Sequence, residues 1–230
     1  MTRNTKRYED KFRQLDYEKL GLEQGEQLEH CMDEKSFGGK YYAPEWCISN
    51  YGRGYSLAAD KWLVPQAIGT HRAYWGFTGN IQPKVHQLVV NYFPNESDEV
   101  ALEFFEEGNL HCHHIIPIEI PDELKVQTCE NEKERIEHCM KCNRKSNVVY
   151  QEKKHDHKND TRITNGNETE EEQAETAVWS SDMILFRNIA ANSGKRDGNS
   201  NGAYFVYSKD ENGKLARTLK MVLNLKGTKI

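Results

Sequence analysis

The stretch His-His-Ile-Ile-Pro-Ile at residues 113–118 determines the fold class that we expect for this chain. Two adjacent histidines lead into an apolar run that contains proline, which is unusual for a β-strand. Imidazoles beside such a run are partly desolvated, and a histidine in that setting serves best as a metal ligand or a general base. Further polar groups follow at Asn131 and in the run Cys-Met-Lys-Cys-Asn-Arg-Lys at 139–145. The sequence therefore predicts a polar site in which these groups converge on one ion.

Composition bounds the class of protein. The chain has 230 residues, of which 29% are charged and 37% hydrophobic, which fits one large domain or a core with appendages. The formal net charge of -5 argues mildly against a protein that coats DNA non-specifically. It does not exclude a nuclease, because local basic patches govern contact with DNA.

Neither a membrane span nor a secretion signal is visible. No apolar run approaches the roughly 18 residues that a spanning helix needs, and the first ten residues lack the apolar block of a signal peptide. We therefore expect a cytoplasmic, intracellular protein that does not contact membranes. Its six cysteines should be thiols or metal ligands rather than disulfides.

The N-terminal half divides into two parts. Residues 1–39 alternate charge with Leu and Tyr and predict a helical appendage. Residues 40–95 are rich in aromatic residues and punctuated by Gly and Pro, which favours short strands. Within them, apolar residues over 85–93 recur at helical spacing, and Pro94 ends that helix.

The C-terminal half begins with an acidic segment at 96–110 that predicts a short amphipathic helix. Residues 147–178 contain few apolar side chains and predict a flexible polar linker. Residues 179–230 predict a helix followed by a β-hairpin whose turn is Asp-Glu-Asn-Gly at 210–213. Helices and strands in this order indicate an α+β protein.

Three motifs occur in an order that resembles one nuclease family. Trp-Cys-Ile-Ser-Asn-Tyr-Gly-Arg-Gly-Tyr-Ser-Leu at 46–57 resembles a Ser-Asn-x-Gly-Arg-x-x-Ser-Leu signature, and Val-His-Gln-Leu-Val-Val-Asn-Tyr-Phe at 85–93 resembles the helix that follows it. With the His-His motif, they resemble the HNH (ββα-metal, His-Me finger) endonucleases of phage and intron type. The resemblance covers roughly residues 40–145.

The resemblance implies a role for each site residue. It makes 40–95 a DNA-binding module with a lead-in helix, and 96–146 the ββα-metal catalytic motif. His114 would be the general base and His113 a metal ligand. Asn131 would hold the loop between the two strands and orient His114, and Asn143 would be the second metal ligand.

The metal expected from the family is Mg²⁺ or Mn²⁺, which would stabilise the scissile phosphate and the leaving oxygen. The intervals between motif residues are a few residues longer than is usual in the family. A second register therefore stays open, in which His138, one helical turn before Cys142, is a metal ligand.

The cysteines suggest a separate structural zinc. Cys139-x-x-Cys142 is half of such a site, and Cys112 and Cys129 are the nearest candidates for the other half. The alternative is that all four are reduced thiols in a small core.

Five residues are candidates for contact with DNA. Arg53 lies in a glycine-containing turn whose backbone can approach a phosphate. The full set comprises Asn50, Arg53, Arg72, Arg144 and Lys145.

The predicted function is metal-dependent hydrolysis of phosphodiester bonds in double-stranded DNA. An HNH site attacks one strand, so symmetric cutting of both strands would require a homodimer. One alternative is a zinc-stabilised DNA-binding module with a degenerate site. Another is a protein-interaction domain that has no affinity for DNA.

Overall fold

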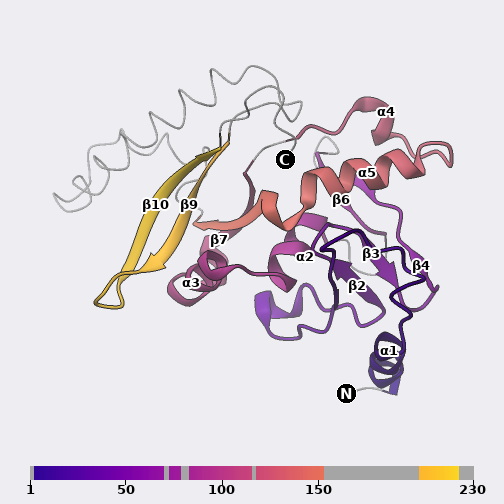
Figure 1. The fold of residues 1–230 in the computed structure, drawn as a ribbon, viewed down its shortest axis with the longest axis horizontal. Helices are drawn as coiled ribbons and strands as arrows, with labels where there is room; N and C mark the ends of the chain where they lie inside the picture. The colour runs from indigo at the N-terminus through magenta and orange to yellow at the C-terminus, as the bar shows by residue number, and fades with distance from the viewer. Residues whose placement is uncertain (1–2, 70–72, 79–82, 116–117, 153–201, 223–230) are drawn as a thin grey trace. The chain divides into compact units, whose positions relative to one another are not determined.

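The computed structural model describes residues 3–69, 73–78, 83–115, 118–152 and 202–222 (Figure 1). They form two compact units. The first contains residues up to 95 together with 120–149, and the second contains 96–119 together with the chain from residue 150 onward. Helices and strands are mixed in both units, in line with the expected α+β class. Among the described residues, no helix has the length and apolar character needed to cross a membrane.

The first unit is built on a four-stranded sheet in the order β1-β2-β3-β4, with antiparallel pairs throughout. Its strands are β1 (Leu28–His30), β2 (Trp46–Ser49), β3 (Gly54–Ser56) and β4 (Lys61–Trp62). All residues of β2 are buried. Strands β5 (Gln66–Ile68) and β6 (Tyr74–Gly76) form a separate antiparallel pair.

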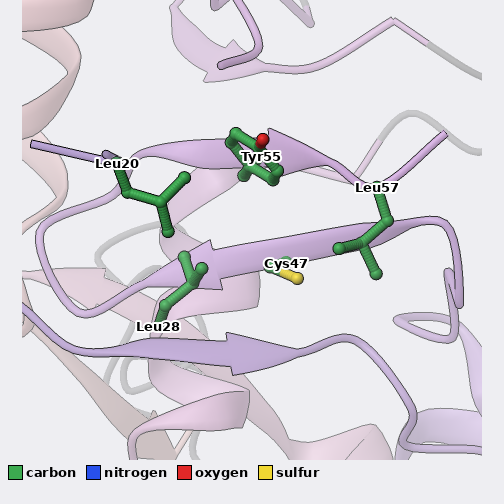
Figure 2. Close-up of a cluster of buried hydrophobic side chains, with 5 residues drawn as sticks. All are labelled: Leu20, Leu28, Cys47, Tyr55 and Leu57. Atoms are coloured by element: carbon green, nitrogen blue, oxygen red, sulfur yellow. The ribbon is translucent and has the colours of Figure 1, made fainter. Parts of the chain in front are cut away.

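Helix α1 (Arg3–Arg13) packs against this sheet through an apolar cluster. Figure 2 shows the buried members of the cluster, which come from β1, β2 and β3, from the segment before β1 and from the residue after β3: Leu20, Leu28, Cys47, Tyr55 and Leu57. Tyr8, Phe12 and Leu15 pack against them. Residues 1–39 were expected to be an appendage, but segments of them supply β1 and part of the core.

Helix α2 (Val85–Tyr92) matches the helix predicted from apolar spacing. It buries Val85, Leu88, Val89 and Val90 and contacts β2, β6 and α5. It ends because Phe93 precedes a proline and has left the helical conformation, with φ at -130° and ψ at 57°.

The remaining helices of the first unit are α4 (Asp122–Lys125) and α5 (Glu132–Asn143). Acidic residues occupy the first turn of each, where they favour the positive end of the helix dipole. Its described residues also form the 3₁₀ turns η1 (Ser36–Gly39) and η4 (Lys145–Asn147).

The second unit contains α3 (Glu96–Phe104), the 3₁₀ turn η3 (Glu107–Asn109) and strand β7 (Leu110–His114). Strand β8 (Val148–Glu152) pairs with β7. The expected C-terminal hairpin forms from β9 (Gly202–Lys209) and β10 (Leu215–Val222), in a register from Leu215↔Lys209 to Val222↔Gly202. The Asp210 carboxylate closes its turn by accepting hydrogen bonds from the backbone N–H groups of Asn212 and Lys214, each at 2.8 Å.

Side chains hold β8 and the hairpin in the second unit. The Gln151 side-chain amide bonds to the backbone of Phe205 as a neighbouring strand would. It donates to the carbonyl of Phe205 and accepts from the N–H of Phe205, both at 2.9 Å. Buried Asp98 of α3 accepts from the N–H of Tyr150 at 2.7 Å. Because these bonds satisfy polar groups inside the unit, residues 150–152 of β8 are part of its core.

Three expectations are corrected by this arrangement. The linker predicted at 147–178 does not begin at 147, because 148–152 form the buried strand β8. The catalytic segment predicted at 96–146 is divided between the two units at residue 119. The strand–strand–helix order is also not observed: among the described residues between β7 and α5 the structure has α4 and no strand, and β7 pairs with β8, which follows α5. The helix predicted at 179–192 lies outside the described residues.

Candidate functional site

Strand β7 carries the histidines that the sequence singled out. Buried Leu110 begins the strand and buried Ile115 follows it, so both ends are fixed by apolar packing. His113 and His114 are half-buried and are the last two residues of the strand. Successive strand residues point to opposite faces. In keeping with this alternation, the His111 and His113 rings meet edge to face, with centroids 6.2 Å apart.

Asn131 organises the connection between α4 and α5. Its Nδ2 donates to the carbonyls of Glu123 at 3.0 Å and Val126 at 2.8 Å, and its Oδ1 accepts from the N–H of Thr128 at 3.3 Å. These bonds fix the loop immediately before α5. Asn131 therefore holds a loop that joins two helices, whereas the expected loop joins two strands; its expected role in orienting His114 stays a prediction.

Asn143 is the last residue of α5 and is 1% exposed. Its Nδ2 donates to the carbonyl of Cys139 at 2.9 Å and contacts the Sγ of Cys139 at 3.4 Å. A metal ligand must present its oxygen to a space that an ion can enter. In this arrangement the Asn143 side chain is closed off from solvent and serves the end of the helix.

His138 is engaged by Trp75. The indole Nε1–H donates to the Nδ1 of His138 at 3.1 Å, and the Cys142 thiol lies 3.4 Å from the same nitrogen. An indole N–H is only a donor, so Nδ1 is unprotonated and the neutral ring carries its proton on Nε2. Metal-bound histidines instead donate their second ring N–H to an acceptor. While the bond from Trp75 persists, neither ring nitrogen of His138 suits a metal.

The four cysteines do not form a zinc site in the part of the chain that the structure describes. No group of three or more His, Cys, Asp and Glu residues suited to a metal occurs there. Cys129 is exposed, whereas Cys139 and Cys142 are buried. Burial raises the pKa of Cys142 to about 12 and raises that of Cys139 well above its usual value. Burial therefore favours the thiol form of both side chains in the metal-free chain.

The turn at residues 50–53, expected to face DNA, packs instead against α5. Gly52 has φ at +82°, and a Cβ there would lie 3.0 Å from the Cβ of Asn143 and 3.4 Å from a methyl of Val85. The Cys139 thiol donates to the Gly52 carbonyl at 3.5 Å, and the N–H of Lys145 donates to the Asn50 carbonyl at 2.7 Å. Glycine is required here because both its conformation and this close approach exclude a side chain.

The polar side chains of the turn also bind their own chain. The Asn50 amide accepts from the N–H of Gln27 at 2.8 Å and donates to the Gly25 carbonyl at 3.1 Å. Arg53 forms a two-pronged ion pair with Glu26, with Nε 2.8 Å from Oε1 and Nη2 bonded to Oε2. Its guanidinium also lies 4.0 Å from the centroid of the Trp62 ring. A phosphate contact by Arg53 would require this buried pair to break.

The cations at the end of α5 are engaged as well. The Arg144 guanidinium pairs with Glu23 at 2.8 Å and lies over the Tyr51 ring at 4.2 Å from its centroid. The Lys145 ammonium donates to the Val148 carbonyl at 3.0 Å. Arg72 lies outside the described residues.

The predicted site residues thus fall into two groups. Asn131, His138 and Asn143 lie in the first unit with the turn at 50–53, and His113 and His114 lie in the second. Sequence reasoning missed Trp75 and Glu26 as partners of His138 and Arg53. No local signal marks them, since each pair is separated by many residues and arises only from folding.

The comparisons with known proteins add one solved structure. The chain is similar to the HNH homing endonuclease I-HmuI, with 14% sequence identity over 84% of this chain and 77% of that one, and a TM-score of 0.34. No family model and no curated protein matches the chain. Because the TM-score is low, the assignment of function rests on the residues themselves.

Proposed function

We propose that this chain is an endonuclease that hydrolyses phosphodiester bonds in DNA, with His114 as the general base. The observation that carries the proposal is the position of the histidine pair at the end of β7. There His114 is half-buried and is the last strand residue, followed by the buried Ile115. This setting gives an imidazole a fixed position and partial access to water, which a general base needs.

The chemistry follows from that position. The neutral imidazole of His114 accepts a proton from a water molecule, whose oxygen then attacks the phosphorus of the scissile phosphate. The bond from phosphorus to the leaving 3′ oxygen breaks, and that oxygen takes a proton from bulk water, while the His114 imidazolium later returns its proton to solvent. Transfer to a positioned base typically contributes 10²- to 10⁴-fold to the rate.

The family resemblance implies a divalent ion. When bound, such an ion would neutralise charge on the phosphate. The α5 residues do not fit that role as they lie here. Asn143 is closed off from solvent and its amide is bonded to Cys139, and His138 accepts a hydrogen bond from Trp75. A requirement for Mg²⁺ or Mn²⁺ is therefore a prediction from the resemblance, which activity measured with each ion and with EDTA tests.

The test is cleavage of supercoiled plasmid by the wild type, by His114→Ala and by His111→Ala, each with Mg²⁺, with Mn²⁺ and with EDTA. His111 is the matched control because it is a half-buried histidine on the same strand. We expect nicking or linearisation by the wild type and by His111→Ala, and a loss of at least about 100-fold in His114→Ala. Equal activity in His114→Ala and the wild type would refute the proposal.

The second candidate is a DNA-binding module without catalysis. It is favoured by the hydrogen bonds of Asn143 with Cys139 and of His138 with Trp75, because these are the two α5 residues expected to hold the ion. It predicts a gel shift with duplex DNA by a wild type that cleaves nothing under any metal condition, and an unchanged affinity in His114→Ala.

A further inference from the structure

Helix α1 presents three cations that pair with no described residue of the chain. Lys6, Arg7 and Arg13 are exposed, and within the described residues none of them forms an ion pair or a side-chain hydrogen bond. Asp10 is also exposed on this helix. Among the described residues, the exposed charged side chains of α1 are therefore three positive and one negative. The chain as a whole has a net charge of -5, which makes this local excess of positive charge distinctive.

The opposite side of α1 is firmly attached to the first unit. Tyr8, Phe12 and Leu15 pack against the apolar cluster drawn in Figure 2. The Thr5 hydroxyl lies 3.1 Å from the Tyr42 hydroxyl, and the Lys11 ammonium donates to the Leu57 carbonyl at 2.6 Å. The helix therefore holds its exposed cations at fixed positions along its axis.

Helix stability accounts for Arg13, which lies in the last turn of α1, but not for Lys6. The first turn of α1 contains no acidic residue, and Lys6 closes that turn. Negative charge is favoured at the N-terminal end of a helix and positive charge at the C-terminal end. Lys6 therefore lies at the electrostatically unfavourable end, which points to a role outside the helix.

The cations first expected to contact DNA behave in the opposite way. Arg53 is paired with buried Glu26, Arg144 with Glu23, and Lys145 with a backbone carbonyl. These contacts stabilise the turn at 50–53 and the end of α5. Among the described residues, cations without such partners lie on other surfaces, and these are available for phosphate contacts.

We propose that the exposed face of α1, through Lys6, Arg7 and Arg13, binds the phosphate backbone of double-stranded DNA. The choice of DNA as the polyanion rests on the proposed function. A rise of 1.5 Å per residue places Lys6 and Arg13 about 10 Å apart along the helix, so the three side chains reach more than one phosphate. Such contacts position the protein on the duplex and carry no sequence information.

The test measures duplex affinity by fluorescence anisotropy over a series of salt concentrations. The triple variant Lys6→Gln, Arg7→Gln, Arg13→Gln is compared with Lys61→Gln, Lys133→Gln, Lys141→Gln, a control that removes the same charge from exposed positions elsewhere in the first unit. Each phosphate contact contributes about 0.9 to the slope of log affinity against log salt. We expect the slope to fall by about 2 to 3 in the α1 variant and to fall by less than about 1 in the control.

Two results would overturn the inference while leaving the proposed function intact. In one, plasmid cleavage by the wild type persists and the α1 variant keeps the wild-type slope. In the other, the control lowers the slope as much as the α1 variant does. If the wild type binds vesicles of anionic lipid but no duplex at low salt, both the inference and the nuclease proposal fail. Circular dichroism of the variant confirms that α1 still folds.

Discussion

The turn at 50–53 and helix α1 both carry cations in the first unit, and they use them differently. Arg53 of the turn is bound to Glu26 and lies over Trp62, whereas Lys6, Arg7 and Arg13 of α1 have no such partner among the described residues. In the motif that resembles a DNA-binding signature, Gly52 packs against α5 and Arg53 holds Glu26, whereas α1, which has no motif, carries three exposed cations. The difference teaches that the partners of a residue, rather than its place in a motif, indicate its role.

The largest expected effect comes from breaking the Arg53–Glu26 pair with Arg53→Ala. The Glu26 side chain is 0% exposed and the Arg53 side chain 14%, so the substitution leaves a buried carboxylate unpaired. Removing one partner of such a pair costs about 3–5 kcal/mol. The matched control is Arg144→Ala, whose pair is 38% and 50% exposed and should contribute no more than about 1 kcal/mol. Urea unfolding measures both, and equal effects would break the comparison.

A smaller effect is expected from Gly52→Ala. The new methyl group would meet the Cβ of Asn143 at 3.0 Å at a backbone φ of +82°. We expect a loss of about 1–3 kcal/mol from strain and crowding. Gly21→Ala is the control, because Gly21 also has positive φ, at +60°, but has nothing within 4 Å of a Cβ. Thermal unfolding that shows Gly21→Ala to be the more damaging would mean that the turn does not brace α5.

Acid should weaken the Arg53–Glu26 pair. Burial alone raises the pKa of Glu26, but the hydrogen bond from Arg53 and further bonds outweigh it and hold that pKa below its usual value. The unfolded chain therefore takes up the proton first as pH falls. The stability from this pair is present above about pH 4.3, the pKa of a free glutamate, and is lost as pH falls through the folded value. Urea midpoints from pH 7 to pH 3 should fall less steeply in Glu26→Gln than in the wild type, and parallel slopes would contradict this.

The smallest effect concerns α1 itself. The Lys6→Gln, Arg7→Gln, Arg13→Gln variant should unfold within about 0.5 kcal/mol of the wild type, because exposed side chains without partners contribute little. Loss of Lys6 from the first turn should favour the helix slightly, and loss of Arg13 from the last turn should disfavour it by a similar amount. A destabilisation above about 1 kcal/mol would show that these cations hold the fold and are not reserved for a ligand.

Local patterns predicted local elements well. The apolar spacing of 85–93 gave α2, and the Asp-Glu-Asn-Gly turn gave the β9–β10 hairpin. The strand β8 was missed because Val148–Glu152 leads into a long polar run, and its burial depends on Asp98 and Phe205, which are distant in sequence.

The site was harder to predict than the elements. The residue types of the motif were visible, and Asn131 does hold a loop. The roles of Arg53, His138 and Asn143 were not visible, because they depend on Glu26, Trp75 and the Gly52 turn, none of which is marked by local spacing. Only the folded chain brings these partners together.

The most direct test measures cleavage and stability on the same two variants. Single-turnover rates on a plasmid-derived duplex and urea midpoints are taken for the wild type, His114→Ala and Arg53→Ala, with divalent metal present. The account predicts that His114→Ala loses at least about 100-fold in rate at an unchanged midpoint, and that Arg53→Ala loses stability yet still cleaves when folded. Two results would contradict this prediction. In one, His114→Ala cleaves as fast as the wild type. In the other, Arg53→Ala is folded but has lost about 100-fold or more in cleavage rate.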